Sequence, residues 1–94
     1  MDLSFWFANM DSLKNKMSDV RVRILQNNPD IIAFCETWIQ NDVLNPNFYP
    51  SECLEINGYN LYRYDNIGAI KGGILLYIKH NLDGGVCKKN DENF

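Results

Sequence analysis

Two polar side chains stand directly after short apolar runs of the chain, and they are the strongest candidates for chemistry. Asn9 follows the run 3–8, and Glu36 follows the run 31–35. Parallel strands end at the same edge of a sheet, and ligand sites of open α/β sheets gather at that edge. If both runs are parallel strands, Asn9 and Glu36 share one site. The alternative is that Asn9 caps the following helix and that Glu36 is a solvated strand end.

The other residue types that often do chemistry have ordinary settings in this sequence. His80 is the single histidine and directly follows an apolar run, so we expect a solvated strand-end residue. Cys35 lies inside an apolar run, which favours an inert buried thiol. The chain has three cysteines and no C-x-x-C pair, so neither a disulfide framework nor a thiolate zinc site is indicated and a reducing compartment fits best. The remaining candidate acids are expected to be turn or surface residues: Asp65, Asp83 and Asp91.

The elements that must position Asn9 and Glu36 follow from the spacing of apolar residues. The run 3–8 predicts a strand covered on both faces. Apolar residues at 13, 17, 20 and 24 then predict an amphipathic helix with Asp11 or Ser12 as N-cap. The helix should end before Pro29, and the run 31–35 predicts a second buried strand. Strand, helix and strand together predict a βαβ unit.

The second half of the chain predicts a long connection followed by two strands. Residues 40–58 carry several turn-forming pairs and predict a long surface connection. The segments 59–64 and 74–79 predict an antiparallel β-hairpin. We therefore expect a mixed α/β domain over residues 1–79 and a polar, frayed tail over residues 80–94.

The amino-acid composition limits the classes of protein to which this chain can belong. The chain has 94 residues, 46% hydrophobic and 22% charged, which is typical of one small globular domain. Its net charge of -3 does not favour nonspecific polyanion binding. The most apolar later stretch, 72–78, is far shorter than the roughly 20 residues that span a bilayer, and the N-terminus does not resemble a signal peptide. We expect an intracellular protein, cytoplasmic or nuclear, with no membrane partner.

Four motifs occur in order along the chain: N-x-x-S-L-x-N-K from Asn9, P-D-I-I-x-x-x-E-T-W from Pro29, G-Y-x-x-x-R-x-D from Gly58, and G-G-I-L-L-Y-I-K from Gly72. Together they resemble the endonuclease/exonuclease/phosphatase superfamily. They are most similar to the endonuclease domain at the N-terminus of reverse-transcriptase polyproteins of non-LTR retrotransposons. The resemblance covers about residues 3–79, and four ordered motifs are more specific than any single one.

The resemblance implies the N-terminal part of a four-layered α/β sandwich with an active site at one end. It also implies that Glu36 is the carboxylate ligand of Mg²⁺ (or Mn²⁺), and that Asn9 helps to position the metal and the attacked phosphate. Trp38 would buttress the Glu36 carboxylate. By the same resemblance Arg63 and Lys71 flank a hairpin turn near bound nucleic acid and would contact phosphates, although ordinary surface charge is the alternative.

The later motifs of the family, a G-D-x-N segment and a terminal Asp-His pair, do not follow Lys79. The first hypothesis is therefore a fragment of a DNA-nicking endonuclease that is inactive alone and whose partners are DNA and the remainder of the polyprotein. The second is a phosphoesterase of the same superfamily that acts on small phosphoesters. The third is a noncatalytic fold remnant that acts as an interaction module and self-associates through uncovered sheet faces.

Overall fold

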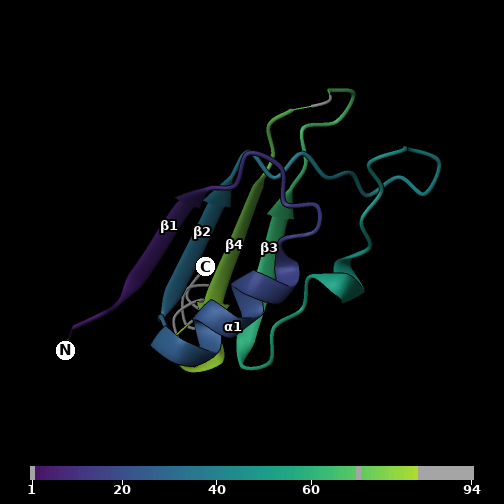
Figure 1. The fold of residues 1–94 in the computed structure, drawn as a ribbon. Helices are drawn as coiled ribbons and strands as arrows, with labels where there is room; N and C mark the ends of the chain where they lie inside the picture. Colours follow the sequence, from purple (N-terminus) through teal and green to yellow (C-terminus); the bar gives the residue numbers. More distant parts are fainter. Residues whose placement is uncertain (1, 70, 83–94) are drawn as a thin grey trace, which may run out of the picture.

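One four-stranded mixed sheet forms the body of the protein (Figure 1). The computed structural model describes residues 2–69 and 71–82. Its elements in chain order are β1 (Phe5–Asn9), α1 (Met17–Asn27), β2 (Ile31–Cys35), the 3₁₀ turn η1 (Ser51–Cys53), β3 (Tyr59–Tyr64) and β4 (Ile74–Lys79). The strand order is β1-β2-β4-β3, with β1 and β2 parallel and β4 antiparallel to both of its neighbours. This confirms the βαβ unit and the hairpin.

Helix α1 begins later than the sequence predicts. Its N-cap position is Lys16, and no side chain caps it. Asp11 and Ser12, the expected caps, instead have φ angles of +48° and +83° in the loop after β1. The backbone N–H groups of Ser12 and Leu13 donate to the carbonyls of Glu36 and Thr37, at 3.0 and 2.9 Å. The start of the helix is shifted because these long-range hydrogen bonds hold the loop against the end of β2.

The end of α1 lies where the sequence places it. Asn28 has a left-handed conformation with φ +46°, and its N–H donates to the Ile24 carbonyl at 2.7 Å. Asparagine tolerates this conformation better than most residues do, and the following Pro29 cannot continue a helix. The chain then turns directly into β2.

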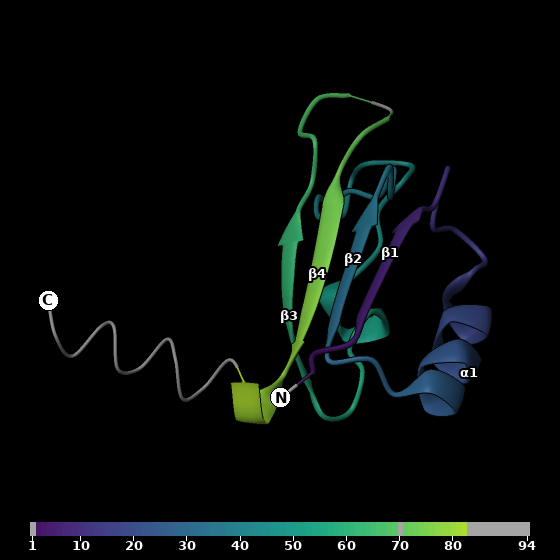
Figure 2. The same cartoon turned by 90° about the vertical axis from the view of Figure 1, so that its left-hand side faces the viewer.

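The core lies between the sheet and α1, on one face of the sheet only. Figure 2 shows α1 on one side of the strands. Its buried residues, Met17, Val20 and Ile24, belong to the same core cluster as Phe34 and Tyr77 of the sheet.

Tyr77 is fully buried in that core. Its hydroxyl donates to the Leu54 carbonyl at 2.7 Å, which ties the segment after η1 to the sheet. Burial raises the pKa of the Tyr77 hydroxyl well above its ordinary value.

The opposite face of the sheet is exposed, which corrects two expectations. Phe5 and Phe7 of β1 are 53% and 68% exposed, so β1 is not covered on both faces. Cys35 is exposed as well and is not a buried thiol. An apolar strand pattern indicates that both faces suit burial, but within the described residues α1 covers only one. We call this surface the open face; it comprises Phe5, Phe7, Ala33, Cys35, Ile74 and Tyr64.

The connection from β2 to β3 is irregular, as predicted, but it is well anchored. Gln40 is buried, and its side-chain amide donates to the carbonyls of Asn66 and Ala69 at 2.8 and 3.1 Å. Arg21 of α1 donates to the carbonyls of Cys53 and Glu55. These bonds fix the connection against both the helix and the β3–β4 loop.

The expectations for the C-terminal tail and for its cysteine and aspartates concern residues 80–94. Residues 80–82 are helical, and residues 83–94 of the expected tail lie outside the described residues, together with Cys87, Asp83 and Asp91. Within the described chain, no helix has the length and apolar character needed to cross a bilayer.

Candidate functional site

Asn9 and Glu36 lie at the same edge of the sheet. Asn9 is in register with Cys35, the last residue of β2, and Glu36 follows immediately. The Met10 N–H donates to the Cys35 carbonyl at 2.9 Å, so the two strands stay paired up to this edge. The parallel pairing therefore produces the juxtaposition that the sequence predicted.

The Glu36 carboxylate is held by a neighbouring indole. Trp38 Nε1–H donates to Glu36 Oε1 at 2.9 Å. Both residues have left-handed backbone conformations, with φ angles of +55° and +58°. Non-glycine residues seldom adopt this conformation, and such strain clusters at functional sites. The contact between Trp38 and Glu36 matches the buttressing role expected for Trp38.

Lys71 brings a positive charge to the same edge. It lies in the β3–β4 loop, and its ammonium is 5.2 Å from the centre of the Trp38 ring. This distance is that of a cation–π contact. The residue is exposed, so its ammonium stays accessible to a ligand.

The segment that carries Glu36 packs closely against the start of β4. The N–H groups of Thr37 and Trp38 donate to the carbonyls of Gly73 and Gly72, at 3.4 and 2.9 Å. Gly73 has φ +95°, and a Cβ atom there would collide with Thr37 Oγ1. Glycine is therefore required for this approach. Thr37 is fully buried, and its hydroxyl has no hydrogen-bond partner among the described residues.

Asn9 caps a turn and not a helix. Its Oδ1 accepts the Asp11 N–H at 3.0 Å, an arrangement typical of an Asx turn. The side chain is exposed. The alternative interpretation of Asn9 as a helix cap does not hold, because α1 begins only at Met17.

Arg63 is bound within the fold. Its guanidinium donates to both oxygens of Asp65, to the Tyr49 carbonyl and to Ser51 Oγ. The side chains of Arg63 and Asp65 are only 10% and 7% exposed, so neither is the surface charge that the sequence suggested. These four bonds use four of the five guanidinium N–H groups. In the structure Arg63 holds the β2–β3 connection against β3.

The donor set at the edge suits a hard divalent cation. Glu36 offers a carboxylate and Asn9 an amide oxygen, and Mg²⁺ is typically held by one or two carboxylates with water and substrate phosphates. No cluster of three or more His, Cys, Asp or Glu side chains that would hold a metal occurs among residues 2–69 and 71–82. His80 does not contribute, because it lies beyond Lys79 at the opposite end of β4 and is exposed, as expected for a strand-end residue.

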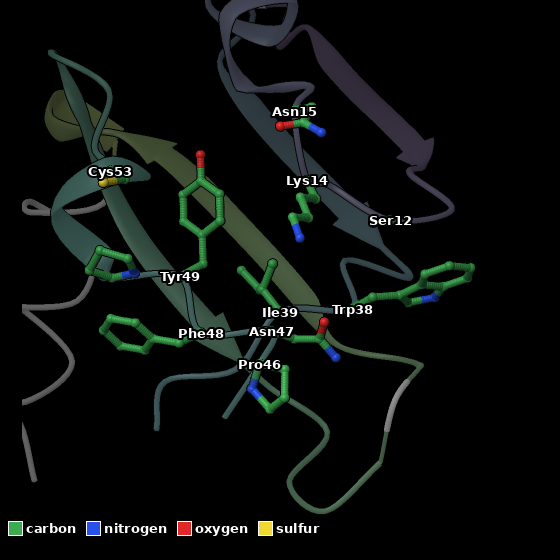
Figure 3. A pocket seen from close by; sticks show the side chains of 11 residues that line it. Ser12, Lys14, Asn15, Trp38, Ile39, Pro46, Asn47, Phe48, Tyr49 and Cys53 are labelled. Atoms are coloured by element: carbon green, nitrogen blue, oxygen red, sulfur yellow. The ribbon is translucent and has the colours of Figure 1, made fainter. Parts of the chain in front are cut away.

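A pocket of 340 Å³ lies beside this edge, and the sequence analysis missed it (Figure 3). The loop after β1 supplies Lys14 and Asn15, the end of β2 supplies Trp38, and the β2–β3 connection supplies Asn47 and Tyr49. Lys14 and Asn15 fall within the helix predicted from the apolar residues at 13, 17, 20 and 24, but they lie in the loop before α1. Residues 45–50 consist entirely of asparagine, proline and aromatic residues, and this composition could have indicated the pocket.

Three AP endonucleases of known structure resemble this protein. LMAP from Leishmania major is 20% identical, with a TM-score of 0.66 over 83% of this chain and 24% of its own chain. The APE2 catalytic domain from Xenopus laevis is 18% identical, with a TM-score of 0.61 over 82% and 23%. An AP endonuclease from Archaeoglobus fulgidus is 19% identical, with a TM-score of 0.64 over 82% and 27%.

These likenesses define the fold. The sheet and helix match the N-terminal part of an AP endonuclease-like α/β fold, as the resemblance implied. The chain spans about a quarter of the length of these solved structures. No family model and no curated protein matches the sequence.

Proposed function

We propose that this chain is the N-terminal part of a divalent-metal-dependent endonuclease domain that hydrolyses phosphodiester bonds in DNA. The observation that carries the proposal is the Glu36 carboxylate, held by Trp38 at the sheet edge that it shares with Asn9. The AP endonuclease-like fold supports the reaction class. The ordered sequence motifs favour an origin in a non-LTR retrotransposon polyprotein, whose remainder would then be the covalent partner.

Each residue at the edge has a distinct part in this proposal. Glu36 would hold Mg²⁺ or Mn²⁺, which when bound stabilises negative charge on a phosphate. Asn9 would orient the attacked phosphate, and Trp38 would hold the carboxylate through its indole N–H. Lys71 would contact a neighbouring phosphate of the strand. Arg63 is given a positioning role, because four of its five N–H donors are already used.

The chain by itself is proposed to be inactive. Phosphodiester hydrolysis needs a group that activates the attacking water in addition to a metal ligand. Among residues 2–69 and 71–82, no cluster of three or more His, Cys, Asp or Glu side chains forms around Glu36. The missing groups would come from the part of the domain that this chain does not span.

Metal binding and cleavage are tested separately. Mn²⁺ titrated into the ¹⁵N-labelled chain should broaden NMR signals around Glu36 and Asn9 first, and Glu36→Gln should abolish this. Glu52→Gln, which removes an exposed carboxylate in η1, is the matched control. Broadening that is indifferent to Glu36 would contradict the metal site. Plasmid nicking by the chain alone that disappears in Glu36→Gln would contradict the inactivity.

The open face supports a second candidate, a noncatalytic interaction module. It presents Phe5, Phe7, Tyr64 and Ile74 at 50–68% exposure on one sheet surface. Large exposed apolar patches mark interaction surfaces. If Mn²⁺ shows no preference for Glu36 while the chain self-associates through this face, the module replaces the nuclease fragment as the better account.

A further inference from the structure

The pocket beside Trp38 has the chemistry of a site for a planar anion. Its wall includes the three aromatic residues Trp38, Phe48 and Tyr49. Among the described residues, Lys14 is the one cationic side chain on that wall, and no aspartate or glutamate lines it. In a chain of net charge -3, a pocket without an acid and with a lysine selects a negatively charged ligand.

The polar groups of the pocket are available to a ligand. Within the described part of the chain, no hydrogen bond engages the Lys14 ammonium, the Asn15 amide or the Tyr49 hydroxyl. Figure 3 shows Lys14 and Asn15, from the loop after β1, on one side of the pocket and Tyr49, from the β2–β3 connection, on the other. A ligand between them would meet an aromatic ring on one side and donors on the other.

The backbone fixes this arrangement in advance. Ser12 and Asn15 have φ angles of +83° and +68°, and the N–H groups of Ser12 and Leu13 are bonded to the carbonyls of Glu36 and Thr37. Lys16 donates from its ammonium to the Met10 carbonyl. On the other wall, Arg63 donates to the Tyr49 carbonyl at 2.7 Å. Because both walls are held by long-range bonds, a ligand would pay little ordering cost on binding.

We propose that this pocket binds one nucleotide, with the base against the Tyr49 ring and the phosphate on the Lys14 ammonium. Aromatic rings stack on any base, and the side-chain amides of Asn15 and Asn47 can donate to and accept from a heterocycle edge. A volume of 340 Å³ is within the range of small-ligand sites. The nucleotide belongs either to a nucleic acid strand or to the free pool. The inference goes beyond the proposed cleavage, because it needs neither Glu36 nor a metal ion.

Fluorescence of the full 94-residue chain carrying Trp6→Phe tests the pocket, since Trp38 is then the only tryptophan. Deoxyadenosine 5′-monophosphate in EDTA should change the Trp38 emission saturably. It should bind about tenfold or more tightly than either deoxyadenosine or deoxyribose 5-phosphate, because each of these lacks one half of the recognised group. Absence of saturable binding, or equal binding of deoxyribose 5-phosphate, overturns the proposal.

Matched variants locate the site. Lys14→Gln should reduce affinity for the nucleotide about tenfold and leave affinity for deoxyadenosine unchanged, whereas Lys79→Gln, the same charge change at the far end of β4, should alter neither. Tyr49→Leu should weaken both ligands about fivefold or more. Lys14 is exposed, so its variant stays informative if Tyr49→Leu fails to fold. Equal effects of Lys14→Gln and Lys79→Gln would refute the assignment.

Two further measurements separate the sources and the two proposals. Tighter binding of a short oligo-deoxyadenylate than of the mononucleotide assigns the pocket to a strand, and equal binding assigns it to a free nucleotide. Glu36→Gln should leave nucleotide binding in EDTA intact. Loss of binding in that variant would show that the signal comes from the proposed metal site and would overturn a separate pocket.

Discussion

The indole N–H of Trp38 donates to the carboxylate of Glu36 across 2.9 Å, two residues apart on a backbone that is left-handed at both positions. A regular strand would send these two side chains to the same face without bringing their polar ends together. The unusual backbone turns the indole edge toward the carboxylate. The irregular end of β2 is thus what builds the candidate site.

Trp38→Phe should loosen the carboxylate with little effect on the fold. The variant keeps a smaller aromatic ring near Lys71 and removes the N–H donor, which is worth about 1 kcal/mol of folding free energy. Groups that orient a metal ligand typically contribute tenfold or more to metal affinity, so Mn²⁺ affinity should fall about tenfold. Trp6→Phe, on the core side of β1, is the control and should leave it unchanged. Equal Mn²⁺ affinity in both variants would contradict the role given to Trp38.

Arg63→Met should destabilise the fold substantially. The variant keeps the aliphatic stem but leaves a largely buried Asp65 carboxylate without its partner, which costs about 3 kcal/mol. Urea denaturation measures the change. Lys79→Met breaks a more exposed ion pair with Asp30, whose side chains are 20% and 23% exposed, and should cost less. If the two variants lose equal stability, Arg63 does not anchor the connection as described.

The sequence predicted the elements that local periodicity and turn chemistry encode. The βαβ unit, the end of α1 before Pro29 and the β-hairpin all follow from local periodicity and turn chemistry. The edge shared by Asn9 and Glu36 followed from the parallel pairing alone. The β1–β2 pairing joins residues 26 positions apart, but it follows from the general rule for a strand–helix–strand connection.

The errors share one physical cause, which is long-range structure. The late start of α1 depends on hydrogen bonds from Ser12 to Glu36, 24 residues away, which no local pattern encodes. The exposure of Phe7 and Cys35 depends on what covers the second face of the sheet. The pocket that contains Lys14 and Tyr49 exists only once the β2–β3 connection folds back on the loop after β1.

The Asp30 carboxylate should stabilise the chain at neutral pH and lose this contribution in acid. The Ser4 N–H donates to its carboxylate at 2.9 Å and Lys79 pairs with it, and these contacts lower the pKa of Asp30 below its ordinary value. A carboxyl with a lowered folded-state pKa contributes stability above its unfolded-state pKa, about 4, and loses it as the pH falls through the folded-state value. Asp30→Asn should therefore be less stable than the parent at pH 7.

Melting temperatures between pH 2 and pH 7 check this linkage. The difference between the parent and Asp30→Asn should shrink progressively below about pH 4. Asp2→Asn, which changes an exposed carboxylate before β1, should show no such pH-dependent gap. A gap that is constant across the whole range would show that Asp30 acts through packing and not through its charge.

Self-association should be weakened by substitutions on the open face and not by substitutions of exposed apolar residues elsewhere. Replacing Phe7 and Ile74 together by threonine removes two residues that are 68% and 50% exposed and keeps good strand formers. Sedimentation velocity should show a clear fall in oligomers, with little change in melting temperature because the core lies on the other side of the sheet. Leu25→Gln on the outer face of α1 should not reduce oligomers. Equal oligomer content in both variants would contradict the open face as the contact surface.

Gly73→Ala should disturb the segment that carries Glu36, although the two residues are far apart in the sequence. Alanine at φ +95° is strained, at a cost of about 1 kcal/mol or more, and its Cβ would also collide with Thr37 Oγ1. Gly68→Ala, at φ +79° with open space around it, carries the strain without the collision. Urea denaturation should therefore show a larger loss for Gly73→Ala, and the Glu36 and Trp38 amide signals should shift only in that variant.

The double variant Thr37→Ala/Gly73→Ala isolates the collision. Thr37→Ala alone should cost little, because its buried hydroxyl has no partner among the described residues and its removal relieves a desolvation penalty. In the double variant the backbone strain at residue 73 remains but the overlap is gone. Its stability should then return to about that of Gly68→Ala, and the Glu36 and Trp38 signals should move back toward their parent positions. If the two single losses simply add, the close approach of Gly73 and Thr37 does not position the segment that carries Glu36.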